Sequence, residues 1–438
     1  MTTDTTTLLV TGARVLTPGG EWPRGWIAVE GRRIAAMGQG RPPERRRATA
    51  DVLDASGLVV LPGFVDLHVH GAVGDDVMDA DPDGLRRMAR FYATHGVTAW
   101  LPTTMTASGR DLDRALEAVG EVLGPVDRGA TVLGAHLEGP YLSPVRQGAQ
   151  DRSLIRVAER AEATRLLDSG IVRLLAVAPE VEGNRWLVAE AVARGVTVSA
   201  GHTDATYDQA LAAVADGVRH VTHAFNAMRP LGHREPGMLG AALTVPELAC
   251  ELVADNVHVH PAAMRLLLQA KGADGVVLVT DAVRATGLPD GAYQVGDQPA
   301  IHMDGAIRLA DGTLAGSVLT LDRALHNLQS ATGRPLAELW AATSRNAARA
   351  IGVDDVKGSL EEGKDADLVL LYLKEFAHHQ DHGIPDGDQG GRQGDARTPL
   401  ELRVVATVAE GVLVHGGERL RRATPTLPAT HSGRPPPG

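Results

Sequence analysis

Histidine and acidic side chains stand at the ends of several short apolar runs in this sequence of 438 residues. The first run closes with His68 and His70. Side chains two residues apart on a β-strand lie on the same face, so these two imidazoles can bind one metal ion together. Short motifs also arise by chance, and an isolated His-x-His pair is more often two structural histidines at a strand end than a metal site.

Four later apolar runs end in the same way, and the repetition favours a metal site. They close with Glu138, His202, His223 and Asp281. Burying four imidazoles and two carboxylates together costs free energy unless a cation pairs with them. Zinc accepts such a mixture of nitrogen and oxygen ligands, and iron, cobalt or manganese can replace it. The sequence therefore predicts a divalent metal centre.

The expected chemistry follows from this metal centre. A divalent metal lowers the pKa of bound water to about 7, which supplies hydroxide at neutral pH. Asp281 ends the last apolar run, where its carboxylate can take a proton from water and return it to a leaving group. A purely metal-ligating role for Asp281 stays open. The predicted reaction class is metal-assisted hydrolysis of an amide or a similar bond.

The apolar runs also predict the fold that must position these residues. Amphipathic stretches such as Asp83–His95 and Asp111–Leu123 join most of the runs. Eight strand–helix units indicate an α/β fold, a (β/α)8 barrel, in which catalytic residues lie at the carboxyl ends of the strands. A doubly wound sheet is the alternative, although no glycine-rich phosphate loop follows the first strand. The eight runs are Val59–Val69, Val97–Leu101, Val132–Leu137, Val172–Val177, Val196–Ala200, His220–Thr222, Leu248–Ala254 and Val276–Thr280.

Strand-like segments flank the predicted barrel on both sides. We expect residues 1–58 and 351–416 to form a small β-sandwich built from both termini, next to a barrel that spans residues 59–350. The composition of residues 378–398 is rich in Gly, Asp and Gln and predicts a disordered insertion. The Pro-, Arg- and Thr-rich residues 417–438 predict a disordered tail.

The composition excludes several classes of protein. The chain carries 54 acidic and 43 basic side chains, and its net charge of −11 repels nucleic acid and anionic membrane surfaces. The single cysteine, Cys250, excludes an intrachain disulfide and a cluster of thiolate ligands. The sequence lacks an apolar stretch of about 18 residues and a basic segment before Leu8, so we expect neither a membrane span nor a secretory signal. These features favour a cytoplasmic protein.

The motifs resemble those of the amidohydrolase superfamily, and within it the N-acetylglucosamine-6-phosphate deacetylases. The segment Pro62–His70 is typical of the superfamily, and the resemblance extends to about Val414. It implies hydrolysis of N-acetyl-D-glucosamine 6-phosphate to D-glucosamine 6-phosphate and acetate, in amino-sugar catabolism. Four motifs are typical of the deacetylases themselves: His136-x-Glu138-Gly139-Pro140, Gly201–Thr206, Thr222–Met228 and Arg234–Gly237.

The resemblance also implies roles for individual residues. In this family the residues matching Glu138, His202 and His223 hold the principal metal. Relatives with a second metal keep the pair that corresponds to His68 and His70, so the resemblance implies one or two ions per subunit. Glu138 would then bridge the ions, and the residue matching Asp281 is the acid and base.

Substrate contacts and assembly are likewise implied by the resemblance. Arg234 matches a phosphate-binding arginine, and relatives complete that phosphate site across a homodimer interface. His258 matches a histidine that contacts the substrate. By residue type alone, Arg234 is equally compatible with an exposed turn and His258 with a position near a helix N-cap. The other matched contacts are Asn226, Ala227, Leu314, Ala315 and Gly316.

The sequence departs from the family at one substrate-binding motif. Relatives have Lys-Gly-Ala-His where this chain has Gln147-Gly148-Ala149-Gln150. Gln150 can donate a neutral hydrogen bond but cannot supply an imidazolium. We expect Ala149 and Gln150 to line the substrate site. Two alternatives stay open, namely a deacetylase of another N-acyl amino sugar or sugar phosphate, and a catalytically silent sugar-phosphate-binding protein.

Overall fold

The computed structural model describes residues 7–48, 50–374, 401–417 and 420. The predicted disordered insertion at 378–398 and nearly all of the predicted tail at 417–438 lie outside these described residues. Among the described helices, none combines the length and apolarity that crossing a membrane requires.

Eight parallel strands form a closed barrel, which confirms the predicted (β/α)8 fold. Strands β11 to β16 pair in sequence order, and β6 pairs with β9. Bridges from Val69 to Ala282 and from Thr103 to His136 join the two sheets into a ring. The barrel strands are β6 (Phe64–Val69), β9 (Val97–Pro102), β11 (Ala135–Glu138), β12 (Val172–Val177), β13 (Thr197–Ala200), β14 (His220–Val221), β15 (Ala249–Leu252) and β16 (Val276–Leu278), with the short β10 (Thr131–Val132) beside β9.

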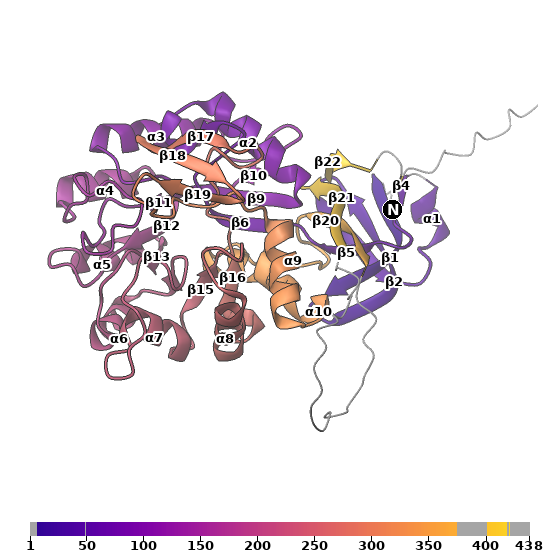
Figure 1. The fold of residues 1–438 in the computed structure, drawn as a ribbon. Coiled ribbons are helices and arrows are strands. Elements are labelled where there is room, and N and C mark those ends of the chain that lie inside the picture. Colours follow the sequence, from indigo (N-terminus) through magenta and orange to yellow (C-terminus); the bar gives the residue numbers. More distant parts are fainter. Residues whose placement is uncertain (1–6, 49, 375–400, 418–419, 421–438) are drawn as a thin grey trace, which may run out of the picture.

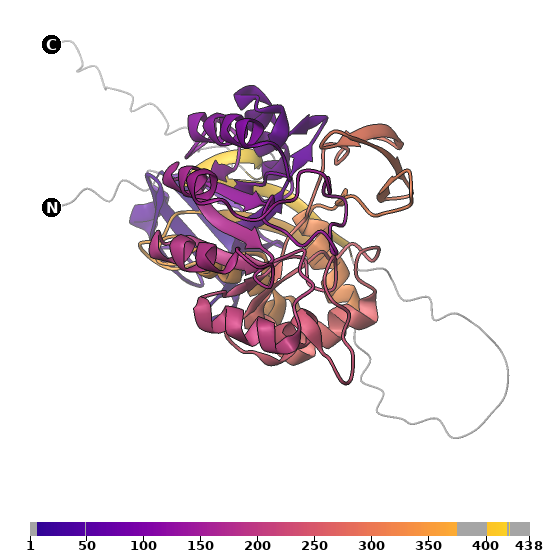
Figure 2. The ribbon, with the colours of Figure 1, turned by 90° about the vertical axis from the view of Figure 1, so that its left-hand side faces the viewer.

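A helix follows each barrel strand, and the helices surround the strands (Figures 1 and 2). Asp81 caps the first helix by accepting hydrogen bonds from the backbone nitrogens of Asp83 and Gly84. Thr206 and Gln209 form a capping box at the start of the fifth. The eight helices are α2 (Pro82–Thr94), α3 (Gly109–Glu121), α4 (Arg160–Asp168), α5 (Arg185–Ala193), α6 (Tyr207–Asp216), α7 (Gly237–Thr244), α8 (Pro261–Lys271) and α9 (Leu321–Thr332).

Strands from both ends of the chain form a separate sheet beside the barrel (Figure 1), which confirms the prediction that both termini build one small β domain. Its strand order is β22-β21-β20-β5-β1-β2-β3, so it is one continuous sheet that encloses an apolar core. The short helix α1 (Glu44–Arg47) belongs to this region, and α10 (Leu336–Leu339) and α11 (Arg345–Ala350) follow the barrel. The strands are β1 (Leu8–Thr17), β2 (Gly20–Glu30), β3 (Arg33–Gln39), β4 (Asp51–Asp54), β5 (Val59–Pro62), β20 (Leu368–Lys374), β21 (Glu401–Ala409) and β22 (Val412–Gly416).

The predicted first barrel strand, Val59–Val69, is wrong in its boundaries. Residues of β5 pair with β1 and β20 in the terminal sheet, and only β6 belongs to the barrel. The chain passes between the two sheets at Gly63, where an added Cβ would lie 2.2 Å from Oγ1 of Thr98. Because the residues of both strands are buried, the apolar run shows no break at this position.

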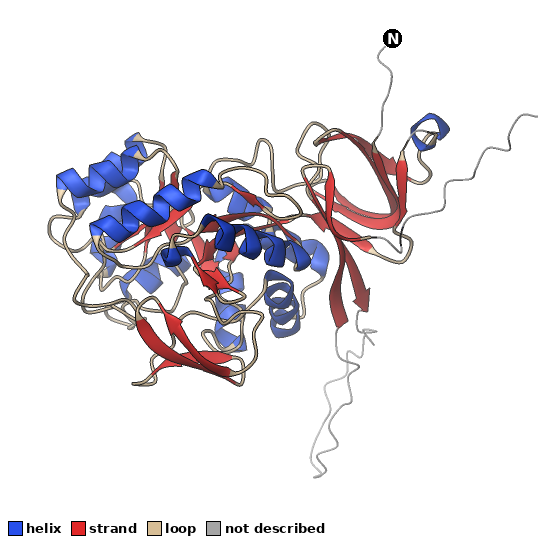
Figure 3. Cartoon of the chain, turned by 90° about the horizontal axis from the view of Figure 1, so that it is seen from above, coloured by secondary structure: helices blue, strands red, loops and turns tan. Residues whose placement is uncertain are grey.

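A three-stranded antiparallel sheet between β16 and α9 was not predicted (Figures 2 and 3). Its inner face places Val295, Ala300 and Ile307 against Met105 and Val283. This sheet covers one side of the barrel mouth and leads into residues 314–316. Its strands are β17 (Gly291–Val295), β18 (Gln298–Met303) and β19 (Ala306–Leu309), and a small hairpin of β7 (Gly71–Ala72) and β8 (Asp75–Asp76) follows β6.

Candidate active site

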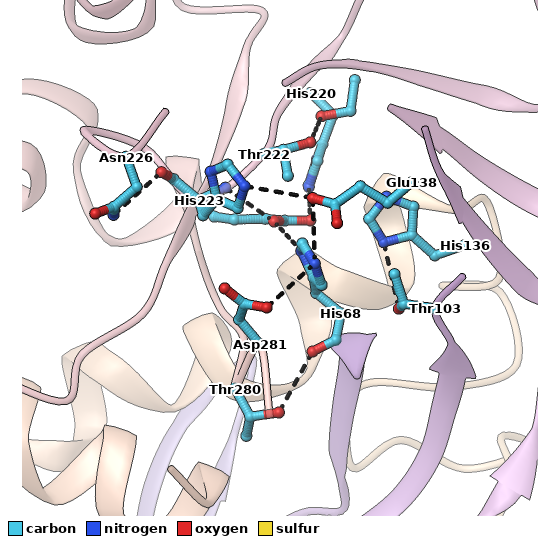
Figure 4. Close-up of polar contacts among 12 residues, drawn as sticks. His68, Thr103, His136, Glu138, His220, Thr222, His223, Asn226, Thr280 and Asp281 are labelled. Carbon is cyan, nitrogen blue, oxygen red and sulfur yellow. Dashed lines mark hydrogen bonds and ion pairs between the residues drawn. The ribbon is translucent and has the colours of Figure 1, made fainter. Parts of the chain in front are cut away.

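The predicted metal ligands converge at the carboxyl ends of the barrel strands (Figure 4). Oε1 of Glu138 lies 3.3 Å from Nε2 of both His202 and His223. Oδ1 of Asp281 lies 3.3 Å from Nε2 of His70. Together with His68, whose Nε2 lies 3.5 Å from each of these two oxygens, the six side chains form one cluster. All six are at most 7% exposed.

The outer nitrogens of three imidazoles are anchored in a way that suits metal binding. Nδ1 of His202 donates to the carbonyl oxygen of Arg146 at 2.9 Å, and Nδ1 of His70 donates to the carbonyl oxygen of Thr103 at 3.2 Å. Nδ1 of His68 lies 3.0 Å from a carboxylate oxygen. A proton on Nδ1 leaves the lone pair of Nε2 pointing into the cluster, which is the tautomer that a metal ion requires.

Glu251 supplies that carboxylate and was not predicted as a functional residue. It lies in β15, is 0% exposed, and accepts hydrogen bonds from His68 Nδ1 at 3.0 Å and from the backbone nitrogen of His223 at 3.0 Å. Its other oxygen lies 3.1 Å from Nε2 of His220. Glu251 therefore orients two of the predicted ligands. A signal was present in the sequence, because an acidic side chain in a buried parallel strand is rare unless it is paired.

The backbone at the strand ends turns abruptly to direct these side chains inward. His202, His223 and Asp281 have positive φ angles of 47°, 29° and 50°, and Ala227 follows with 47°. A non-glycine residue in this region costs about 1–3 kcal/mol and persists where the surrounding structure enforces it. Such strain at several ligand positions is typical of a preorganised functional site.

The atoms of the cluster fit a divalent cation. Nε2 of His68 lies 3.1 Å from Nε2 of His70, and the same distance separates Nε2 of His202 from Nε2 of His223. Oε1 of Glu138, between these pairs, has no hydrogen-bond partner among the described residues. Lone pairs that face one another at this distance are stabilised by a cation between them. Three groups of possible ligands lie here; the two triads made up only of predicted site residues are Glu138–His202–His223 and His68–His70–Asp281, and the third group is His68–His136–Glu251.

Opposite charges in the cluster stabilise one another strongly. Burial alone would raise the pKa of Glu138 and of Asp281, but the neighbouring imidazoles hold both values below the ordinary range. Burial likewise opposes the charged form of His70, yet the two carboxylates raise its pKa to about 9, so a cation that binds to Nε2 of His70 must displace a proton from it. Both carboxylates are therefore ionised at neutral pH and are available to a cation.

A cavity opens directly onto the cluster, and most of the predicted substrate contacts line it. The lining includes His258, whose Nδ1 lies 2.6 Å from Oδ2 of Asp255. Burial lowers the pKa of His258, but the hydrogen bond and charge of Asp255 outweigh this effect and raise it. The other predicted residues in the lining are Ala149, Gln150, Asn226, Ala227, Leu314 and Gly316.

Two predicted substrate residues lie outside this lining. Ala315 is completely buried among apolar side chains below the cavity. Arg234 lies in the exposed loop between β14 and α7. The structure therefore brings together the predicted metal ligands and seven predicted substrate contacts within one chain, but it does not bring Arg234 to them.

Several residues that were not predicted as site residues line the cavity or lie beneath the metal-ligand cluster. Met105, Val283 and Val295 add apolar surface to the cavity. His136, fully buried beneath it, packs edge-on against the ring of His68, with centroids 4.7 Å apart. Burial lowers the pKa of His136 to about 3, so this imidazole is neutral. It packs as a structural residue.

The site and fold agree with comparisons to known proteins. A model described as the amidohydrolase family matches residues 59–397. The chain belongs to the amidohydrolase family. An N-acetylglucosamine-6-phosphate deacetylase of Lysinibacillus sphaericus is 40% identical over 326 residues, which cover 73% of this chain and 83% of the relative. An N-acetylgalactosamine-6-phosphate deacetylase of Escherichia coli O157:H7 is 42% identical over 323 residues, covering 73% and 85%.

Solved structures of this amidohydrolase branch superpose over nearly the whole chain. A mutant N-acetyl-D-glucosamine-6-phosphate deacetylase from Mycobacterium smegmatis, in complex with N-acetyl-D-glucosamine 6-phosphate, matches with a TM-score of 0.81. It is 34% identical, and the match covers 93% of this chain and 99% of that protein. The predicted resemblance to the amidohydrolases is thereby confirmed.

Proposed function

We propose that this chain hydrolyses N-acetyl-D-glucosamine 6-phosphate to D-glucosamine 6-phosphate and acetate. The observation that carries the proposal is the convergence of Glu138, His202, His223 and Asp281 at the base of one cavity. Four carboxylate and imidazole groups in this position suit metal-assisted amide hydrolysis. The identity to deacetylases of amino-sugar phosphates supports the substrate class.

We expect the two triads to hold the cations. Glu138, His202 and His223 would bind one divalent ion, and His68, His70 and Asp281 a second. Nitrogen and oxygen donors in threes favour zinc, with iron, cobalt or manganese as substitutes. A bound divalent cation polarises a carbonyl group and lowers the pKa of water.

Asp281 is proposed as the acid and base of the reaction. Its carboxylate is ionised and lines the cavity, so it can accept one proton from the water that attacks the acetyl carbon. As the carbon–nitrogen bond breaks, Asp281 returns that proton to the amide nitrogen. The second proton of the water passes from the new carboxyl group to the amine, so the products are acetate and the protonated amine of the sugar, and the carboxylate of Asp281 is regenerated.

The walls of the cavity are proposed to orient the sugar phosphate. His258 is held by Asp255, and its raised pKa favours an imidazolium that attracts a phosphate or a hydroxyl group. Asn226 and Gln150 place amide side chains at the cavity wall. Because Nδ2 of Asn226 donates to the carbonyl oxygens of His223 and Ala224, its Oδ1 can accept from a sugar hydroxyl. Leu314 and Gly316 bound the cavity on the side of the three-stranded sheet.

Arg234 is proposed to bind the phosphate across a homodimer. Its guanidinium suits a phosphate dianion, but the residue is exposed and lies outside the cavity lining of its own chain. A second copy of the chain would carry Arg234 to the cavity. Sedimentation of the wild type tests the dimer.

A second substrate, N-acetyl-D-galactosamine 6-phosphate, is favoured by one specific observation. The relative named N-acetylgalactosamine-6-phosphate deacetylase is 42% identical, similar to the 40% of the relative named N-acetylglucosamine-6-phosphate deacetylase. Gln150 also stands where the family pattern has histidine, so the part of the cavity proposed to hold the acetamide group differs from that of the family pattern.

The experiment is acetate release from both sugar phosphates by zinc-loaded protein. We expect turnover of N-acetyl-D-glucosamine 6-phosphate and its loss in Asp281→Asn, with zinc still bound to the variant. Faster turnover of the galactose epimer would favour the second candidate. Zinc-loaded wild type that releases acetate from neither substrate would refute both.

A further inference from the structure

The side chain of Gln150 connects the metal cluster to a backbone amide. The backbone N–H of Thr106 donates to Oε1 of Gln150 at 2.7 Å, and Nε2 of Gln150 donates to Oε2 of Glu138 at 2.7 Å. Because a backbone N–H can only donate, the first bond determines which end of the amide faces Glu138. Gln150 is only 5% exposed, so water does not readily replace either bond.

The two oxygens of Glu138 consequently have different surroundings. Oε1 accepts no hydrogen bond from the residues that the structure describes, and it faces His202 and His223. Oε2 accepts a hydrogen bond from Nε2 of Gln150, and it also lies 3.4 Å from Nε2 of His70. A donated N–H occupies one of the two lone pairs of Oε2 and draws negative charge from the oxygen, which weakens it as a metal ligand.

We propose that Gln150 is a positioning residue that makes Glu138 a one-oxygen ligand. Oε1 binds the cation beside His202 and His223, while Oε2 is withheld from the cation beside His68 and His70. The chain thus keeps both triads but not a carboxylate that bridges them through its two oxygens. The inference rests on the metal centre of the proposed function and not on the identity of the sugar.

The test compares two glutamine variants of the full chain. Gln150→Met keeps the length of the side chain but removes the donor to Glu138. Gln298→Met is the matched control, because Nε2 of Gln298 donates to the carbonyl oxygen of Ala149 at 2.6 Å and holds the same loop without contacting Glu138. Stepwise zinc binding is measured by competition with a chromophoric chelator.

Gln150→Met should change the two binding steps in opposite directions. The first step weakens by about tenfold, because Glu138 loses the partner that orients it, and the second step tightens by about tenfold, because Oε2 becomes a ligand. If the wild type binds one zinc ion, the variant gains a second. Gln298→Met should keep the wild-type ratio of the two dissociation constants. An unchanged ratio in Gln150→Met, or an equal change in Gln298→Met, would overturn the proposal.

A measurement on the wild type removes any dependence on how the variants fold. Infrared difference spectra of zinc binding are recorded on protein with isotope-labelled glutamate. We expect the widely separated carboxylate stretches of a one-oxygen ligand, whereas the closely spaced stretches of a bridging carboxylate would contradict the inference. Neither measurement uses a substrate. Failure of acetate release would therefore count against the proposed function without deciding the role of Gln150.

Discussion

Replacement of Glu251 tests whether a buried carboxylate outside the cavity controls metal binding. Its oxygens contact His68 Nδ1 at 3.0 Å, the backbone nitrogen of His223 at 3.0 Å and His220 Nε2 at 3.1 Å. Glu251→Gln keeps the shape and can still accept the first two bonds through its carbonyl oxygen. It removes the negative charge that holds the proton on Nδ1 of His68. Glu251→Ala removes the contacts as well.

The expected magnitude follows from this difference. Loss of a carboxylate that orients a metal-ligating imidazole typically lowers metal affinity by about 10–100-fold. We expect about tenfold for Glu251→Gln, equivalent to about 1.4 kcal/mol, and about 100-fold for Glu251→Ala, about 2.8 kcal/mol. The assay is zinc competition with a chelator, on protein whose circular dichroism confirms folding.

The control for Glu251 is another carboxylate at the same end of the barrel. Glu180 accepts hydrogen bonds from Oγ1 of Thr203 and the backbone nitrogen of Asp204, both at 2.6 Å, and has no imidazole among these partners. Glu180→Gln should retain the wild-type zinc affinity. Wild-type affinity in Glu251→Ala, or an equal loss in Glu180→Gln, would refute the role assigned to Glu251.

Three further predictions address the loop at the cavity, the phosphate contact and the terminal sheet. Gly148→Ala should lower zinc affinity by about tenfold in the same chelator assay, because φ is +55° and the new Cβ would lie 3.1 Å from Cε1 of His202. Arg234→Met should raise KM by about tenfold or more with little change in kcat. The reason is that a contact with the phosphate, remote from the acetamide, stabilises the bound substrate and the transition state equally. A lowered kcat with unchanged KM would contradict this. Lys357→Met should lower the free energy of unfolding by about 3–5 kcal/mol in urea at pH 8, because Nζ lies 2.9 Å from Oδ2 of both Asp365 and Asp367. Burial opposes the charge of Lys357, but these carboxylates raise its pKa above the ordinary 10.5. As the pH rises, the unfolded chain therefore loses this proton before the folded chain does, so the stabilisation is complete below pH 10.5 and declines above it. The difference in unfolding free energy between wild type and variant should shrink at pH 11.

The cluster of predicted metal ligands could be anticipated from sequence because each of these residues stands next to the end of an apolar strand. Parallel strands in a closed barrel bring their carboxyl ends to one mouth, so His68, Glu138, His202 and Asp281 meet although they are distant in sequence. The boundary at residue 59 was wrong for the opposite reason. Two buried strands joined by Gly63 have the same apolar composition, and only their pairing distinguishes the sheets.

Contacts made through loops could not be predicted from the sequence. The hydrogen bond from Gln150 to Glu138 depends on the path of the loop after β11, which no periodicity encodes. The strands β17 to β19 carried no usable signal, because along β18 the exposed residues include Ile301 and Met303 while the buried ones are Ala300 and His302, the reverse of an apolar-inward alternation. The structure places Arg234 on an exposed loop of the single chain, and a role for it at the cavity of a second copy stays a prediction.

The most direct test of the central claim is a crystal structure of zinc-loaded protein with anomalous data at the zinc absorption edge. The account predicts a peak within about 2.0–2.2 Å of Oε1 of Glu138 and Nε2 of His202 and His223. A protein that releases acetate and contains zinc, but whose anomalous peak lies away from these three side chains, would contradict the claim that the barrel strands form the catalytic metal centre.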